Sequence, residues 1–172
     1  MIQPLLINKA TVEKYLQVAI GYNTNDFSRF IREAQEFDLK PLLCDEFYFD
    51  MLKNKDTAPN PAIIIGQEYT IGGKIYYHEG LEAVLSYFTY ARFVLKSGAV
   101  STSHGVVTKK TPNSEPISHS EKKDIYYSCR QDANKLFADV AKYMDRKEIN
   151  YKDCLDCDDT TDGDITTRAP QW

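Results

Sequence analysis

Residues 79–97 constrain the fold more than any other segment, because apolar residues recur there at helical spacing and cover most of the helix circumference. One stripe at this spacing consists of Leu81, Val84, Leu85, Phe88, Ala91 and Leu95. Further aromatic residues lie off the stripe: Tyr87, Tyr90 and Phe93. A helix that is apolar most of the way round has to be covered by other elements. We therefore predict that this helix is central and that the rest of the chain packs around it.

Other segments carry apolar residues at the same spacing, and we predict helices over 8–19, 26–39 and 119–146, with a shorter one over 45–53. Pro41 predicts a break or kink at the end of the second of these helices. The long helices should form a bundle. Its core is predicted to include Leu85, Phe88, Leu136 and Phe137.

Residues 63–77 have the pattern of a β-hairpin inserted between helices. Ile63-Ile64-Ile65 is β-branched, and residues 68–71 alternate between polar and apolar. Gly72-Gly73 then supplies the two positive-φ positions that a two-residue hairpin turn requires. The preceding residues, 54–62, are rich in breakers and are predicted to form a loop.

Residues 98–118 match neither a helix nor a strand. A structureless stretch of about 20 residues is unusual inside a compact domain, so we predict a long extended arm that another chain orders. The polar tail at 151–172 is expected to be mobile until it is bound. The fold class is therefore mainly α: a domain over 1–150, with a small bundle of about four to five helices, the hairpin at 63–77 and the arm, followed by the tail.

The arm is predicted to contact a neighbouring copy of the chain. Its backbone groups need partners in water or on another chain. Val106 and Val107 are adjacent, so in an extended conformation they point to opposite sides, and a neighbour could cover both. The alternative is a surface loop without a partner. The candidate interface residues of the arm are Val106, Val107, Thr108, Lys109 and Lys110.

The net charge of −4 lies entirely in the tail, which holds six Asp against Lys152 and Arg168. The residues before the tail balance to zero, without the basic excess with which nucleic-acid-binding proteins neutralise phosphates. We therefore expect no sequence-specific binding of nucleic acid, although DNA could pass along such a surface. The tail is expected to dock on a partner protein through acidic residues that include Asp156, Asp158 and Asp159.

No group of residues in the sequence fits a catalytic, cofactor or metal site. Gly66–Lys74 lacks the spacing of a phosphate-binding loop and its Ser or Thr after the Lys. The calcium-like run Asp158–Asp164 has Ala169 where a bidentate Glu is required. Cys154 and Cys157 form a single CxxC, whereas a structural zinc site needs four ligands. We therefore expect a protein that is not an enzyme and that holds no cofactor or metal.

Location is indicated by two further features of the sequence. We find no secretion signal at its start, so the four cysteines are expected to be reduced thiols in a cytosol. Apolar runs fall far short of the roughly 20 residues that span a bilayer, so no membrane contact is expected.

The order of these segments resembles the head-to-tail connector proteins of tailed phages, also called adaptor or ring proteins, in the form found in phages of Bacteroidetes, including the crAss-like group. The resemblance covers roughly residues 3–150 and is strongest in the central helix and the Gly-Val-Val-Thr-Lys arm after it. The segments that carry it are Arg32–Gln35, Leu39–Leu43, Glu46–Tyr48, the hairpin, Gly80–Phe93, Gly105–Lys109 and Ser114–Ser118.

The resemblance implies a structural virion protein that forms a dodecameric ring beneath the portal, giving DNA a passage at the head–tail joint. Its partners would be copies of itself, the portal protein, the next tail or connector protein, and genomic DNA that passes without sequence-specific binding. It implies a location at the head–tail interface of the virion, after synthesis in the host bacterial cytoplasm. The alternative is a small cytosolic adaptor or regulatory domain that binds one protein partner.

Overall fold

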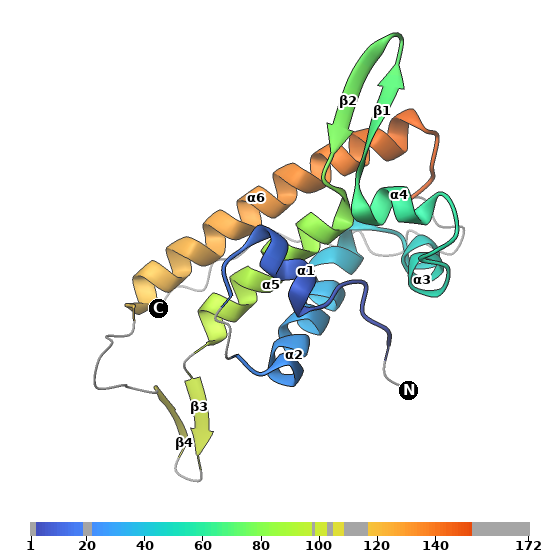
Figure 1. The fold of residues 1–172 in the computed structure, drawn as a ribbon. Helices are drawn as coiled ribbons and strands as arrows, with labels where there is room; N and C mark the ends of the chain where they lie inside the picture. The colour runs from blue at the N-terminus through green and yellow to red at the C-terminus, as the bar shows by residue number, and fades with distance from the viewer. Residues whose placement is uncertain (1–2, 19–21, 98, 103–104, 109–116, 153–172) are drawn as a thin grey trace, which may run out of the picture.

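The computed structural model is mainly helical with an inserted β-hairpin, which confirms the predicted fold class (Figure 1). It describes residues 3–18, 22–97, 99–102, 105–108 and 117–152. The α-helices are α1 (Lys9–Tyr15), α2 (Thr24–Ala34), α3 (Asp45–Lys53), α4 (Asn60–Ile65), α5 (Gly80–Lys96) and α6 (His119–Arg146). The strands are β1 (Gln67–Ile71), β2 (Lys74–His78), β3 (Ala99–Thr102) and β4 (Gly105–Thr108).

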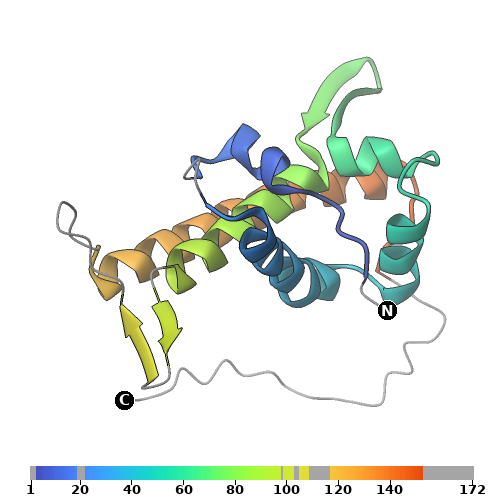
Figure 2. The same ribbon diagram turned by 60° about the horizontal axis from the view of Figure 1, so that its bottom comes forward.

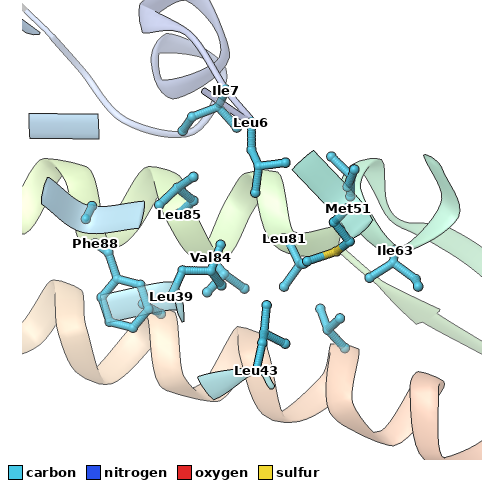
Figure 3. Packing of buried hydrophobic residues seen from close by; sticks show 14 of the residues in the cluster. Leu6, Ile7, Leu39, Leu43, Met51, Ile63, Leu81, Val84, Leu85 and Phe88 are labelled. Atoms are coloured by element: carbon cyan, nitrogen blue, oxygen red, sulfur yellow. The ribbon is translucent and has the colours of Figure 1, made fainter. Parts of the chain in front are cut away.

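Helix α5 is the centre of the molecule, as its apolar circumference predicts. Helices α1, α2, α4 and α6 all pack against it, and Figure 2 shows it running beneath α1 and alongside α6. Leu85 and Phe88 are buried as predicted. Figure 3 shows the core that forms where α5 meets the N-terminal segment and α3, α4 and α6. The labelled residues of this core are Leu6, Ile7, Leu39, Leu43, Met51, Ile63, Leu81, Val84, Leu85 and Phe88.

Helix α6 has the predicted bounds and lies antiparallel to α5 along its length (Figure 1). A capping box starts it: Ser118 Oγ accepts from the Glu121 backbone N–H at 3.2 Å, and Glu121 Oε2 accepts from the Ser118 N–H at 2.8 Å. The prediction that Leu136 and Phe137 are buried is wrong, because both are only half-buried. Helix α6 covers only one side of α5. Only a narrow stripe of α6 is therefore buried against α5, and Leu136 and Phe137 lie at the margins of this stripe. The buried residues of the stripe are Cys129, Ala133, Val140, Tyr143 and Met144.

The second predicted helix does not remain α-helical to residue 39. Helix α2 passes into a π-helical segment, η1 (Gln35–Leu39), and then into a 3₁₀ turn, η2 (Lys40–Leu42), which contains the predicted break at Pro41. Ala34 and Leu39 are both fully buried although they are five residues apart. This is the spacing of a π-helix, whose wider turn returns a side chain to the same face one residue later than an α-helix does.

The predicted loop at 54–62 holds for residues 54–59, which link α3 to α4. Its last three residues and the predicted strand character of Ile63-Ile64-Ile65 are wrong, because Asn60–Ile65 form helix α4. Pro61 lies in the first turn, where its missing N–H costs no helical hydrogen bond. The Asn60 amide donates to Asp50 Oδ2 at 3.0 Å and to the Asn54 carbonyl at 3.1 Å, which holds the start of the helix against α3. Burial of Ile63 and Ile64 against the core outweighs the β-propensity of the three isoleucines.

The predicted hairpin is confirmed, with its strands over β1 and β2. They pair antiparallel from Gln67 with His78 to Ile71 with Lys74, so Gly72 and Gly73 form the two-residue turn. Both glycines have positive φ, 57° and 75°, as a turn of this type requires. The hairpin projects from the bundle at the end where α6 terminates (Figure 1).

The predicted arm is not one extended segment. Part of it folds into a second antiparallel hairpin, in which β3 pairs with β4 from Ala99 with Thr108 to Thr102 with Gly105. The facing backbone groups of 99–102 and 105–108 therefore pair with each other within the same chain, instead of with water or another chain as predicted. Strands of four residues are too short to show a clear alternation, so the sequence pattern did not reveal them.

The predicted tail begins inside the core. Tyr151 is fully buried, and its carbonyl accepts a hydrogen bond of 2.7 Å from the Cys44 N–H. Tyr151 is therefore part of the folded domain rather than of a mobile tail. The rest of the predicted tail, from residue 153, lies outside the described residues.

Two glycines allow the backbones before and after the hairpin to touch. A Cβ on Gly80, whose φ is +77°, would lie 2.4 Å from both the Gly66 nitrogen and the Ile64 carbonyl oxygen. Neither of these backbone atoms can move without shifting α4. We therefore expect Gly80→Ala to lower the free energy of unfolding by at least about 2 kcal/mol, as measured by urea denaturation.

The turn residue Gly73 provides the matched control. It also has positive φ, but a Cβ there would meet no atom within 4 Å. Gly73→Ala should therefore cost only the backbone strain, about 1 kcal/mol. Equal losses for the two variants would show that the close approach at Gly80 contributes nothing.

Candidate interaction surfaces

The inner face of the β1–β2 hairpin is attached to the last turns of α6 by aromatic contacts. The His78 ring stacks on the Tyr143 ring with centroids 4.4 Å apart, and Tyr69 meets Tyr143 edge-on at 4.9 Å. The Gln67 side-chain amide donates to the Tyr143 hydroxyl at 2.7 Å. Three inner-face residues thus converge on one residue of α6.

Arg146 completes this attachment. Its guanidinium lies 3.9 Å from the centroid of the Tyr76 ring and donates to the Tyr69 hydroxyl at 2.9 Å. A cation close to an aromatic face is attracted by the ring's electrons. Because an isolated two-stranded hairpin is at best marginally stable in water, these contacts are what give β1–β2 a fixed position on the bundle.

His78 makes the stability of this attachment depend on pH. Its ring is buried and neither nitrogen has a hydrogen-bond partner. Burial lowers the pKa of His78 below 6.5, although the nearby charge of Asp139 opposes the shift. The unfolded chain therefore binds a proton more readily, and the contribution of neutral His78 to stability is lost as the pH falls from 6.5 through the lowered pKa.

We expect the unfolding free energy of the wild type to fall over this pH range more steeply than that of His78→Phe, which cannot be protonated. Urea denaturation at a series of pH values would measure the difference between the two proteins. Carboxylates elsewhere affect both proteins equally, so they cancel in the difference. Identical pH profiles would show that His78 is not the titrating group.

The outer face of the hairpin carries large apolar side chains into solvent. Ile75 is 67% exposed and Tyr77 is 60% exposed, opposite Thr70 and Glu68 respectively. These four residues are called the hairpin face below. Exposed apolar side chains that lie together on a projecting element are typical of protein–protein contacts.

A buried ion cluster joins η1 to α5 and α6. The Asp38 carboxylate is almost fully buried and accepts two hydrogen bonds from Arg92, at 2.5 and 3.0 Å, and one from Arg130. Glu33 lies 3.8 Å from Arg92 and also pairs with Lys96. The π-helical segment places Asp38 on the buried side, where it binds arginines from two other helices.

Aromatic residues surround this cluster at the surface. Arg92 lies over Phe37 and Arg130 over Tyr126, each 5.4 Å from the ring centroid, and Tyr126 contacts Tyr127 at 5.3 Å. Phe37 is 66% exposed and Tyr127 is 64% exposed. These five residues are called the aromatic-arginine face below. Arginine and tyrosine are enriched among residues that dominate binding energy at protein interfaces.

One hollow of the described surface, of about 520 Å³, is an open depression on the exposed side of α6 next to the aromatic-arginine face. Its lining residues are Asp124, Tyr127, Ser128, Arg130, Gln131 and Asn134. Within the described part of the chain, His, Cys, Asp and Glu do not gather in groups of three or more that could hold a metal ion.

The cysteines of the described residues are in different states. Cys129 is a free, buried thiol, and burial raises its pKa. Cys44 is disulfide-bonded, which corrects the expectation that all cysteines are reduced. A search of the same residues for helices long and apolar enough to cross a membrane finds none.

The candidate residues named from the sequence are only partly within the described structure. Val106, Val107 and Thr108 lie in strand β4. Five others lie outside the described residues: Lys109, Lys110, Asp156, Asp158 and Asp159.

The hairpin face and the aromatic-arginine face were not predicted as sites. Ile75 and Tyr77 are two residues apart in a predicted strand, so alternation alone could have placed them on one face. No local pattern marks the aromatic-arginine face, because its residues come from three elements that are distant in the sequence.

Comparison with known proteins gives a family and no activity. No curated protein and no solved structure matches the chain. A family model described as a family of unknown function, DUF6712, matches residues 39–163, from the end of η1 through α6. Because this match covers well over half of the sequence, the chain belongs to the DUF6712 family.

Proposed function

We propose that this chain is a non-enzymatic subunit of a ring at the head–tail joint of a tailed phage, in the virion, where it binds copies of itself, the portal protein and the next tail protein. The observation that carries the proposal is the position of the two hairpins, which project from opposite ends of α5 (Figure 1). Strand β2 ends two residues before α5 begins, and β3 begins three residues after it ends. A helix of 17 residues separates them by roughly 25 Å.

Projections at opposite ends suit head-to-tail association. Such an interface joins two different patches, and it closes into a ring when the rotation between subunits allows. Each hairpin also has unpaired outer edges: among the described residues, no backbone–backbone hydrogen bond joins either hairpin sheet to another element. A strand edge of this kind can accept backbone hydrogen bonds from another chain.

The proposal includes a passage for DNA without sequence-specific binding. The net charge of −4 gives no general attraction to phosphates. A surface without a basic excess would let DNA move past it, whereas a surface that binds DNA would carry more cations.

Assembly tests the proposal. The wild-type chain is expected to form closed rings of one size, seen as a single large mass by light scattering and as annuli by negative-stain electron microscopy. Replacing Val106 and Val107 together with Asp should abolish the rings, because two carboxylates on β4 would be buried without partners at a subunit contact. Helicity by circular dichroism should be unchanged, since the substitutions lie outside the helical bundle.

The matched control places the same two charges at exposed residues of the turn between α3 and α4, Thr57 and Ala58, which belong to neither the hairpin face nor the aromatic-arginine face. Rings of normal size from the Val106/Val107 variant would show that β4 is not part of the assembly contact. A wild type that stays a single subunit at every concentration, and binds one other protein instead, would favour the adaptor alternative.

A further inference from the structure

The hairpin face and the aromatic-arginine face lie at opposite ends of the α5–α6 pair. The hairpin face is next to the start of α5 and the end of α6. Arg92 is near the end of α5, whereas Tyr126 and Tyr127 are in the first third of α6. The Lys122 ammonium donates to the Ser97 carbonyl at 2.8 Å, which fixes the start of α6 beside the end of α5. The two faces therefore cannot meet within one chain.

The two faces are complementary in charge. Glu68 lies on the hairpin face, and Glu79 is close enough to add to burial in raising the pKa of Tyr77. In the ion cluster of the aromatic-arginine face, the cations Lys96 and Arg130 are the most exposed side chains, at 47% and 32%, whereas Glu33 is 22% exposed and Asp38 only 1%. The Glu68 carboxylate of a neighbour would therefore meet exposed cations, which favours the contact between unlike faces.

The apolar parts of the faces also match. Ile75 and Tyr77 project from a narrow two-stranded hairpin, whereas Phe37 lies beside Arg92, and Tyr127 lies beside the Tyr126 ring that Arg130 covers. Exposed aromatic side chains beside arginines offer both apolar area and cation–π contacts to a tyrosine. A projecting apolar hairpin is a suitable partner for such a surface.

We infer that the hairpin face of one subunit seats on the aromatic-arginine face of the next copy of this chain. The inference rests on the proposed function and names the surfaces that meet in the ring. The β3–β4 hairpin lies at the same end as the aromatic-arginine face (Figure 1), so one end of each subunit would receive the β1–β2 hairpin of its neighbour. The contact is heterologous, so every subunit uses its hairpin face once and its aromatic-arginine face once.

Two substitutions test the contact by complementation. Ile75→Asp disables only the hairpin face, and Tyr127→Asp disables only the aromatic-arginine face. Both side chains are mostly exposed, so neither substitution should change the melting temperature by much. Each variant alone is expected to lose the ring and sediment as a single subunit. Mixed in equal amounts, they should form a 1:1 dimer and nothing larger, because one intact face remains on each chain.

Ile117→Asp is the matched control, since Ile117 is an exposed isoleucine that belongs to neither face. It should assemble like the wild type. If Ile75→Asp disturbs folding, Glu68→Arg is the substitute variant. Glu68 is exposed, and its replacement by Arg reverses the charge of the hairpin face. That variant should weaken self-association at least about tenfold, as two like charges then oppose each other.

The outcomes separate the inference from the proposed function. Normal rings from Ile75→Asp and Tyr127→Asp would overturn the inference and leave the ring itself standing. Single subunits from each variant with no dimer in the mixture would also overturn it, because the two faces would then have other partners. A wild type that never assembles would overturn both, before any variant is made.

Discussion

Phe88→Ala is expected to lower the free energy of unfolding by about 3–5 kcal/mol, the range for removing a buried aromatic ring from a packed core. Phe88 is 1% exposed and lies on the central helix. Its removal leaves a cavity between α5 and α6 that the surrounding helices cannot fill without moving. The Arg130 guanidinium, 5.4 Å from the ring centroid, also loses the aromatic face on which it rests. Chemical denaturation followed by circular dichroism measures the loss.

Phe49→Ala is the control, because Phe49 is the same residue type and 43% exposed. Its ring contacts Tyr48 and Lys40 at the surface of α3, so its removal opens no cavity. This variant should lose about 1 kcal/mol or less. If Phe88→Ala cost no more than Phe49→Ala, the contact between α5 and α6 would not be the main core of the domain.

Asp38→Ala is expected to lower the free energy of unfolding by about 3 kcal/mol, the lower end of the range for removing one partner from a buried ion pair. The variant leaves Arg92 and Arg130 facing each other without the carboxylate that separates them. Glu33 remains 3.8 Å from Arg92, and Arg130 is partly exposed, which keeps the loss from being larger. Thermal and urea denaturation should agree on the size of the loss.

The comparison for Asp38 is Asp139→Ala, which removes an exposed carboxylate paired with Lys142 on the same helix at 2.8 Å. An exposed pair of this kind contributes at most about 1 kcal/mol. A double variant that changes both Asp38 and Arg130 should lose less than the sum of the single losses, since each alone strands a charge. Strict additivity would show that Asp38 and Arg130 do not stabilise each other.

Apolar residues that recur at helical spacing over several turns are enough to show which of the longer segments are helices. The central position of α5, the bounds of α6 and the turn at Gly72-Gly73 all follow from spacing, capping and glycine. These features depend on residues within one element, so a local pattern contains the information that specifies them.

Short elements were decided by tertiary contacts. Ile63-Ile64-Ile65 has strong β-propensity yet lies in α4, because burial against the core outweighs a propensity difference of about 1 kcal/mol. The four-residue strands β3 and β4 form by pairing with each other, which neither segment shows alone.

The candidate surfaces likewise depend on how the helices pack against one another. Asp38 and Phe37 lie where they do because five residues of η1 adopt π-helical geometry, and their partners Arg92 and Arg130 are 54 and 92 residues from Asp38 in the sequence. A face assembled from three helices has no local signature, since the separation of its residues along the chain is unrelated to their separation in space. Short-range spacing specifies each helix, but only packing around α5 brings side chains of different helices onto one surface.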